Sequence, residues 1–175
     1  MAYQKMILLL AICIAIAACD MPNFTYGGKD GKITSNGNLL TLHAEGTPNA
    51  TLGSSGDFNI DGKAVSLSAP QRGLLMLYYQ GVMDIRDQAL GMGKAGAAAG
   101  MKALENSVSG KSDPNDKKKI GDDVNSQTHQ LALKMCQDES NLKTIQDQLI
   151  AQMAAFKPYG GIFPGRSISE CMKDN

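Results

Sequence analysis

The feature that most constrains this 175-residue chain is an apolar run near its N-terminus, residues 6–18, which ends directly before Cys19. One positive charge, Lys5, precedes the run, and this order is typical of a secretory signal peptide. The run is shorter than the roughly 20 residues of a transmembrane helix, so a permanent span is the weaker interpretation. We therefore predict that residues 1–18 are a signal peptide and that the remainder folds after export.

The end of this run, Ile16-Ala17-Ala18-Cys19, matches the lipobox of bacterial lipoproteins, in which the cysteine thiol takes a diacylglycerol. This match predicts cleavage before Cys19, lipidation of Cys19 and a membrane anchor that holds the domain in the periplasm. Under the sorting rule of enteric-type bacteria, Asp20 predicts retention at the inner membrane. Where that rule does not apply, we expect the outer membrane. The alternative is an ordinary small-residue cleavage site, because Ala15-Ile16-Ala17 also has the A-x-A form.

Cysteine usage favours the lipoprotein interpretation. Of the four cysteines, Cys13 leaves with the signal, and an ordinary cut after Ala17 leaves three, one of them unpaired. If Cys19 is acylated, Cys136 and Cys171 have only each other, and an exported domain favours a disulfide between them. That bond would pin the C-terminal tail to a long helix. Two buried free thiols are the alternative.

The length after signal removal suits one domain, and the charge is balanced, with 17 Lys+Arg and 17 Asp+Glu. This balance gives no electrostatic case for nucleic acid or for an anionic membrane surface. Residues 19–36 are polar, Gly-rich and without period, so we predict a lipidated cysteine followed by a flexible tether. Residues 37–175 then form a single α+β domain.

Short alternating apolar segments over residues 38–67 predict a small antiparallel β-meander, with Asp61-Gly62 as the clearest hairpin turn. A helix begins at Ser68-Ala69-Pro70-Gln71, where Ser68 caps and Gln71 reaches back. The pattern continues, or restarts, through residues 91–104, breaks over residues 106–122 and resumes over residues 123–156 as a helical bundle. The face of the first helix that we expect to be buried comprises Leu74, Leu77, Tyr78, Val82, Ile85 and Ala89.

Three motifs bear on chemistry. Asp57-Phe-Asn-Ile-Asp-Gly62 fits the first half of a calcium loop, but Ser68 stands where a bidentate Glu is needed, and strand alternation explains the same residues. Gly110-Lys111-Ser112 ends like a P-loop, but Glu105 replaces the required glycine, so no nucleotide is expected. His43 and His129 have no metal-spaced neighbours. We therefore predict no metal, no cofactor and no catalytic residue.

The segment Gly96-Ala-Ala-Ala-Gly100 is a G-x-x-x-G motif, and Gly93 extends its small-residue surface. Such a surface lets another helix approach closely. Lys94 and Lys102 argue against a membrane-spanning helix. Packing against a helix of the same chain is the simplest expectation, and self-association or membrane contact is the alternative.

A family resemblance is carried by the stretch from Asp61 to Gln80, with I-D-G-K-x-V-x-L followed by S-x-x-Q-R-x-L, and by the Gly-Met-Gly-Lys-Ala-Gly segment at 91–96. Cys136, Phe156-Lys-Pro-Tyr159 and Cys171 also fit it. These parts of the chain resemble the YggN-like family of uncharacterised bacterial envelope proteins. The resemblance covers roughly residues 38–173. It implies the order of strands then helices. The family has no established activity, so it implies no catalytic residue.

The function we expect is a non-enzymatic envelope lipoprotein that binds a protein partner, as a scaffold or as an immunity protein against a secreted toxin. The absence of a recognisable nucleophile, acid–base pair or metal cluster in the sequence favours this class. A cell-wall or lipid hydrolase whose site is not visible in the sequence is the alternative.

Overall fold

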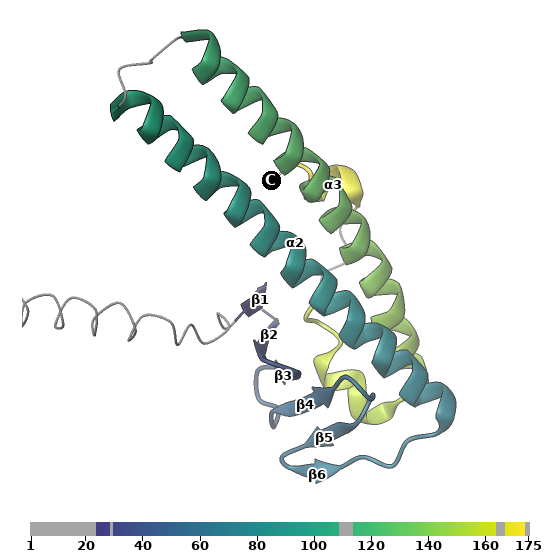
Figure 1. The fold of residues 1–175 in the computed structure, drawn as a ribbon. Helices are drawn as coiled ribbons and strands as arrows, with labels where there is room; N and C mark the ends of the chain where they lie inside the picture. Colours follow the sequence, from purple (N-terminus) through teal and green to yellow (C-terminus); the bar gives the residue numbers. More distant parts are fainter. Residues whose placement is uncertain (1–23, 29, 109–113, 164–166, 174–175) are drawn as a thin grey trace, which may run out of the picture.

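A computed structural model describes residues 24–28, 30–108, 114–163 and 167–173, and Cys19 lies outside these ranges. Six strands precede the helices in the chain (Figure 1). The elements are β1 (Phe24–Gly28), β2 (Gly31–Asn36), β3 (Leu39–His43), β4 (Ala50–Gly53), β5 (Phe58–Ile60), β6 (Lys63–Ala64), α2 (Ala69–Val108), α3 (Pro114–Gln152), the 3-10 helix η1 (Ala154–Tyr159) and α4 (Ile168–Cys171).

The sheet is a meander in which every strand pairs antiparallel with its neighbours in the chain, in the order β1-β2-β3-β4-β5-β6. Period-two alternation produces two buried cross-strand rows, because alternate side chains of each strand point to the same face. Asp61 and Gly62, with φ of 50° and 72°, form the tight turn between β5 and β6, as predicted. The rows are Ile33-Leu42-Ala50 and Ser35-Leu40-Leu52-Phe58.

The predicted α+β fold, a meander followed by helices, is confirmed, but the sheet begins earlier than residue 38. Residues 24–28 and 31–36, which we expected to be part of a tether, form β1 and β2. The sequence of β2, Gly-Lys-Ile-Thr-Ser-Asn, contains a single large apolar residue, and Ile33 is fully buried against the core. One such residue is too weak a period-two signal to be distinguished from a polar linker.

The helix α2 begins as predicted. Ser68 N–H donates to Gln71 Oε1 at 2.9 Å, and Gln71 N–H donates to Ser68 Oγ at 3.4 Å, which is a capping box. The predicted break over residues 106–122 is wrong at both ends, because α2 continues to Val108 and α3 begins at Pro114. Leu77 was also placed wrongly: its side chain is 50% exposed, and Leu75 takes the buried position.

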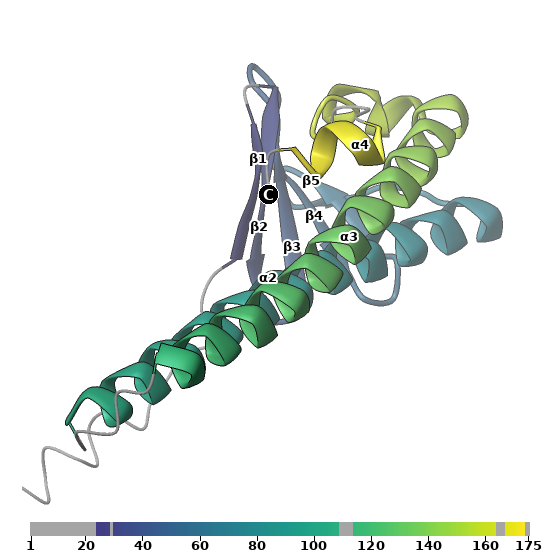
Figure 2. The ribbon, with the colours of Figure 1, turned by 90° about the horizontal axis from the view of Figure 1, so that it is seen from above.

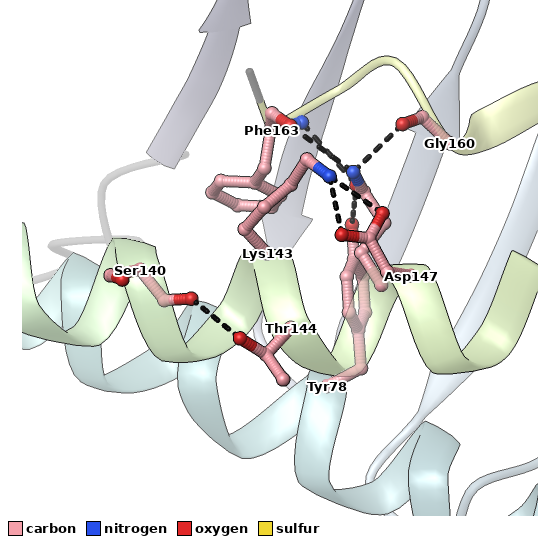
Figure 3. A network of polar contacts seen from close by, with 8 residues as sticks. Tyr78, Ser140, Lys143, Thr144, Asp147, Gly160 and Phe163 are labelled. Carbon is pink, nitrogen blue, oxygen red and sulfur yellow. Dashed lines mark hydrogen bonds and ion pairs between the residues drawn. The ribbon is translucent and has the colours of Figure 1, made fainter. Parts of the chain in front are cut away.

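The core lies between the sheet and the part of the helix pair that the sheet covers. Gln146 is its central polar residue: its Nε2 donates to the carbonyl oxygens of Gly160 at 2.8 Å and Phe163 at 3.2 Å, and its Oε1 accepts from Phe163 N–H and from Tyr78 (Figure 3). Aromatic rings surround this network, with Tyr78 edge-on to Phe156 and Phe163. These contacts fix the chain that follows η1 against α3.

Both long helices extend well past the sheet (Figures 1 and 2). Among the side chains that the structure describes, the last buried residue of α2 is Gln88 and the first buried residue of α3 is Ala132. We call the part beyond them, residues 89–108 of α2 and 114–131 of α3, the arm. At a rise of 1.5 Å per residue, its α2 segment is about 30 Å long. Every arm side chain that the structure describes is exposed or half-buried.

Candidate protein-binding surface

The arm presents apolar residues on the side of α2 that faces away from α3. Three of them have largely exposed side chains: Met101 at 72%, Leu104 at 67% and Val108 at 88%. Gly93, Ala97 and Gly100, also exposed, precede them. At 100° per residue these positions fall within a sector of about 100°. We call them the outer strip: Gly93, Ala97, Gly100, Met101, Leu104 and Val108.

Glycine geometry shows which side of α2 contacts α3. A Cβ on Gly91 would lie 3.5 Å from Leu131 Cδ1, an ordinary packing distance, so Gly91 faces α3. A Cβ on Gly93, Gly96 or Gly100 would have no atom within 4 Å. The expectation that the G-x-x-x-G surface packs against a helix of the same chain is therefore wrong for the residues that the structure describes.

The outer strip lacks charge, although charged residues flank it. Lys94 and Glu105 are eleven positions apart, which places them about 20° from each other on the same edge of the strip. Along the helix axis they are separated by about 16 Å, too far for an ion pair within one helix. The arm thus combines an exposed apolar surface with one charge of each sign along one edge, the pattern of a helix seam that another helix covers.

A pocket of about 420 Å³ lies at the base of the arm. His129 contributes to its wall together with two thioethers, Met92 from α2 and Met172 beside α4. The sequence could not indicate this grouping because the three residues are far apart in the chain. Among the described residues, no group of three or more His, Cys, Asp or Glu side chains is arranged to hold a metal ion.

His43 lies on the sheet and is held by two neighbours. Its Nε2 lies 3.1 Å from Thr34 Oγ1, and its Nδ1 lies 2.8 Å from Asn49 Oδ1. Both ring nitrogens are therefore engaged in hydrogen bonds between strands and loop. These contacts give His43 a structural role in joining β2, β3 and the loop that carries Asn49.

Asp57, the first residue of the calcium-loop motif, is paired with protein groups. Ser55 Oγ donates to Asp57 Oδ2 at 2.6 Å, and Arg72 forms an ion pair with Asp57. The hydrogen bond from Ser55, followed by that from Arg72, lowers the pKa of the Asp57 carboxyl below its ordinary value. These contacts join the β4–β5 loop to the first turns of α2, so the motif has a structural explanation here.

The disulfide predicted between Cys136 and Cys171 is present, with a Cα–Cα distance of 5.7 Å. It joins α4 to α3, as expected for a pinned C-terminal tail. Beside it, Tyr26 Oη donates to Glu139 Oε1 at 2.6 Å, and Cys171 Sγ lies 3.7 Å from Glu139 Oε2. Strand β1 is thereby attached to the same corner. Gly110-Lys111-Ser112 and Cys19 lie outside the described residues.

Comparison with protein families, curated proteins and solved structures found no match to this chain. The similarity to YggN-like proteins stays a prediction from the sequence. None of the helices in the described residues is long and apolar enough to cross a membrane.

Proposed function

We propose that this chain is a lipid-anchored, non-enzymatic protein of the bacterial envelope that binds another protein through the arm. One observation carries the proposal: Met101, Leu104 and Val108 are largely exposed on one side of a helix that extends beyond the core. Large apolar side chains grouped on a surface mark interaction sites in water-exposed proteins. Scaffolding and immunity against a secreted toxin both require such a surface.

The proposed anchor is the lipidated Cys19, supported by the lipobox and by the pairing of Cys136 with Cys171, which leaves Cys19 outside the disulfide. Because β1 begins at Phe24, the linker after Cys19 is short. Five residues span at most about 18 Å when fully extended. The domain would therefore stay near the membrane surface, and its partner would be met there, at the inner or the outer membrane according to the sorting of Asp20.

The test is site-specific photo-crosslinking in living bacteria that produce the full chain. A photoreactive amino acid replaces Leu104 in the arm, and the control replaces Leu77, which is 50% exposed on the same helix next to the core. We expect adducts above the monomer mass at position 104 and at least fivefold fewer at position 77. No adduct at position 104, or equal yields at both positions, would overturn the proposal.

A further inference from the structure

We infer that the partner of the outer strip is the outer strip of a second copy of this chain, packed antiparallel about a two-fold axis between Gly100 and Met101. The inference rests on the proposed function, because it names the protein that the arm binds. Three properties of the strip support it: the distribution of side-chain sizes, the charges along one edge, and the open space around its glycines.

Side-chain size divides the strip into two halves. Gly93, Ala97 and Gly100 form a small half, and Met101, Leu104 and Val108 form a large half. In the antiparallel arrangement residue 93 opposes 108, residue 97 opposes 104 and residue 100 opposes 101. Leu104 of one copy then packs on Ala97 of the other, and Val108 lies at the height of Gly93, while Met101 lies beside Met101 of the second copy at the edge of the strip. A two-fold axis makes this fit occur twice, as in an isologous interface.

The parallel arrangement lacks this fit. It would place Gly93 against Gly93 and Val108 against Val108, so the small halves would leave a gap while the large halves held the helices apart. Loss of close packing along half of the strip removes the dispersion contacts that favour association. The sizes of the side chains therefore select the antiparallel arrangement.

Charge selects the same arrangement. In the antiparallel arrangement, Lys94 of one copy stands at the same height as residue 107 of the other. Glu105 of that second copy is two positions from residue 107, so it lies about 3 Å from Lys94 along the helix axis, on the same side of the seam. Two Lys94–Glu105 pairs would flank the interface, one on each side of the two-fold axis. In the parallel arrangement the two-fold axis would place the charged edges of the two copies on opposite sides of the seam, so no Lys94–Glu105 pair could form.

The glycines permit the close approach that this packing requires. A Cβ at Gly93 or Gly100 would meet no atom of the described residues within 4 Å, so neither position packs against another described part of the same copy. The strip is about 24 Å long, and six residues are fewer than the 20–30 that each side of a standard interface supplies. Such a pair is weak in dilute solution, and confinement to a membrane surface favours it by raising the effective concentration.

The first experiment uses cysteine crosslinking of the full chain in bacterial membranes under mild oxidation. Met101→Cys lies next to the axis, so it should give a reducible band at twice the monomer mass. The two copies of residue 108 are separated by about 22 Å, beyond the reach of about 7 Å between Cα atoms of a disulfide. Val108→Cys alone should therefore give no band, and a band should appear when it is produced together with a Gly93→Cys chain.

The controls are the unsubstituted chain, which reports any crosslink through its own cysteines, and Leu77→Cys. We expect the Met101→Cys band to exceed both at least tenfold. A dimer from Val108→Cys alone, or no dimer from Met101→Cys, would overturn the inference. The proposed function fails separately: photo-adducts at Leu104 that contain only a different protein would exclude the second copy but retain protein binding.

A glycine pair supplies matched variants. Gly100→Gln fills the space that the second copy needs, whereas Gly121→Gln adds the same side chain on α3, where a Cβ also meets nothing within 4 Å. At both positions the added Cβ has open space within one copy. Combined with Met101→Cys, Gly100→Gln should lower the crosslink at least fivefold, and Gly121→Gln should leave it unchanged. An unchanged crosslink in Gly100→Gln would contradict the inference.

Discussion

Tyr78 and Gln146 meet in the core, where the phenol oxygen lies 3.4 Å from the amide oxygen Oε1 of Gln146, and both side chains are fully buried. Gln146 also holds the backbone of Gly160 and Phe163, so one side chain joins α2, α3 and the chain after η1 (Figure 3). This relationship explains why an uncharged polar residue occupies the middle of an apolar core.

Replacing Gln146 with Leu should lower the free energy of unfolding by about 3 kcal/mol, because buried backbone groups of Gly160 and Phe163 lose their partner. Urea denaturation measures the change. Gln148→Leu, on the exposed side of α3, is the matched control and should change stability by less than about 0.5 kcal/mol. Equal effects of the two variants would show that the network contributes nothing specific.

Stability should fall at alkaline pH through Tyr78. Burial, with a smaller contribution from Tyr26, raises the pKa of Tyr78 far above its ordinary value of 10.0. The folded state therefore keeps this proton while the unfolded state releases it, so the stabilisation is complete below about pH 10 and decreases as the pH rises further. The free energy of unfolding, measured in urea at several pH values in this range, should fall less steeply with pH for Tyr78→Phe than for the unsubstituted chain. An equally steep fall in both would exclude Tyr78 as the cause of the pH dependence.

Removing the disulfide should destabilise the domain by about 4 kcal/mol, the chain-entropy estimate for its sequence separation of 35 residues. The variant with both Cys136→Ala and Cys171→Ala is compared with the unsubstituted chain in urea. The bond itself is checked by mass spectrometry after alkylation: both thiols should be labelled only after reduction. Labelling of Cys136 and Cys171 without reduction would rule out the bond.

Lipidation is tested by Cys19→Ala, which should abolish incorporation of labelled palmitate and leave the precursor uncleaved. Cys13→Ala is the matched control, because it removes a cysteine from the same segment without touching the lipobox, and it should be labelled normally. Palmitate incorporation that persists in Cys19→Ala would contradict the proposed anchor.

Several features of the fold could be predicted from local chemistry. Ser68 and Gln71 form the capping box because the spacing of a cap depends only on adjacent turns of helix. Asp61 and Gly62 form a hairpin turn because few residues adopt positive φ. The pairing of Cys136 with Cys171 followed from counting cysteines on the hypothesis of export, and the structure contains this disulfide.

Contacts between residues far apart in the sequence determined the other features of the fold. Ile33 marks β2 as a strand only because β3 and the core cover it, and nothing next to it in the sequence reveals that contact. The direction of Gly100 was equally hidden, since residues 91–104 are mostly Gly and Ala with only Lys94 and Lys102 charged, and such a helix has no clear amphipathic pattern that selects the face toward its neighbour. Only the position of α3, fixed by the Gln146 network and the packed core, turns Gly91 toward Leu131 and leaves the outer strip exposed.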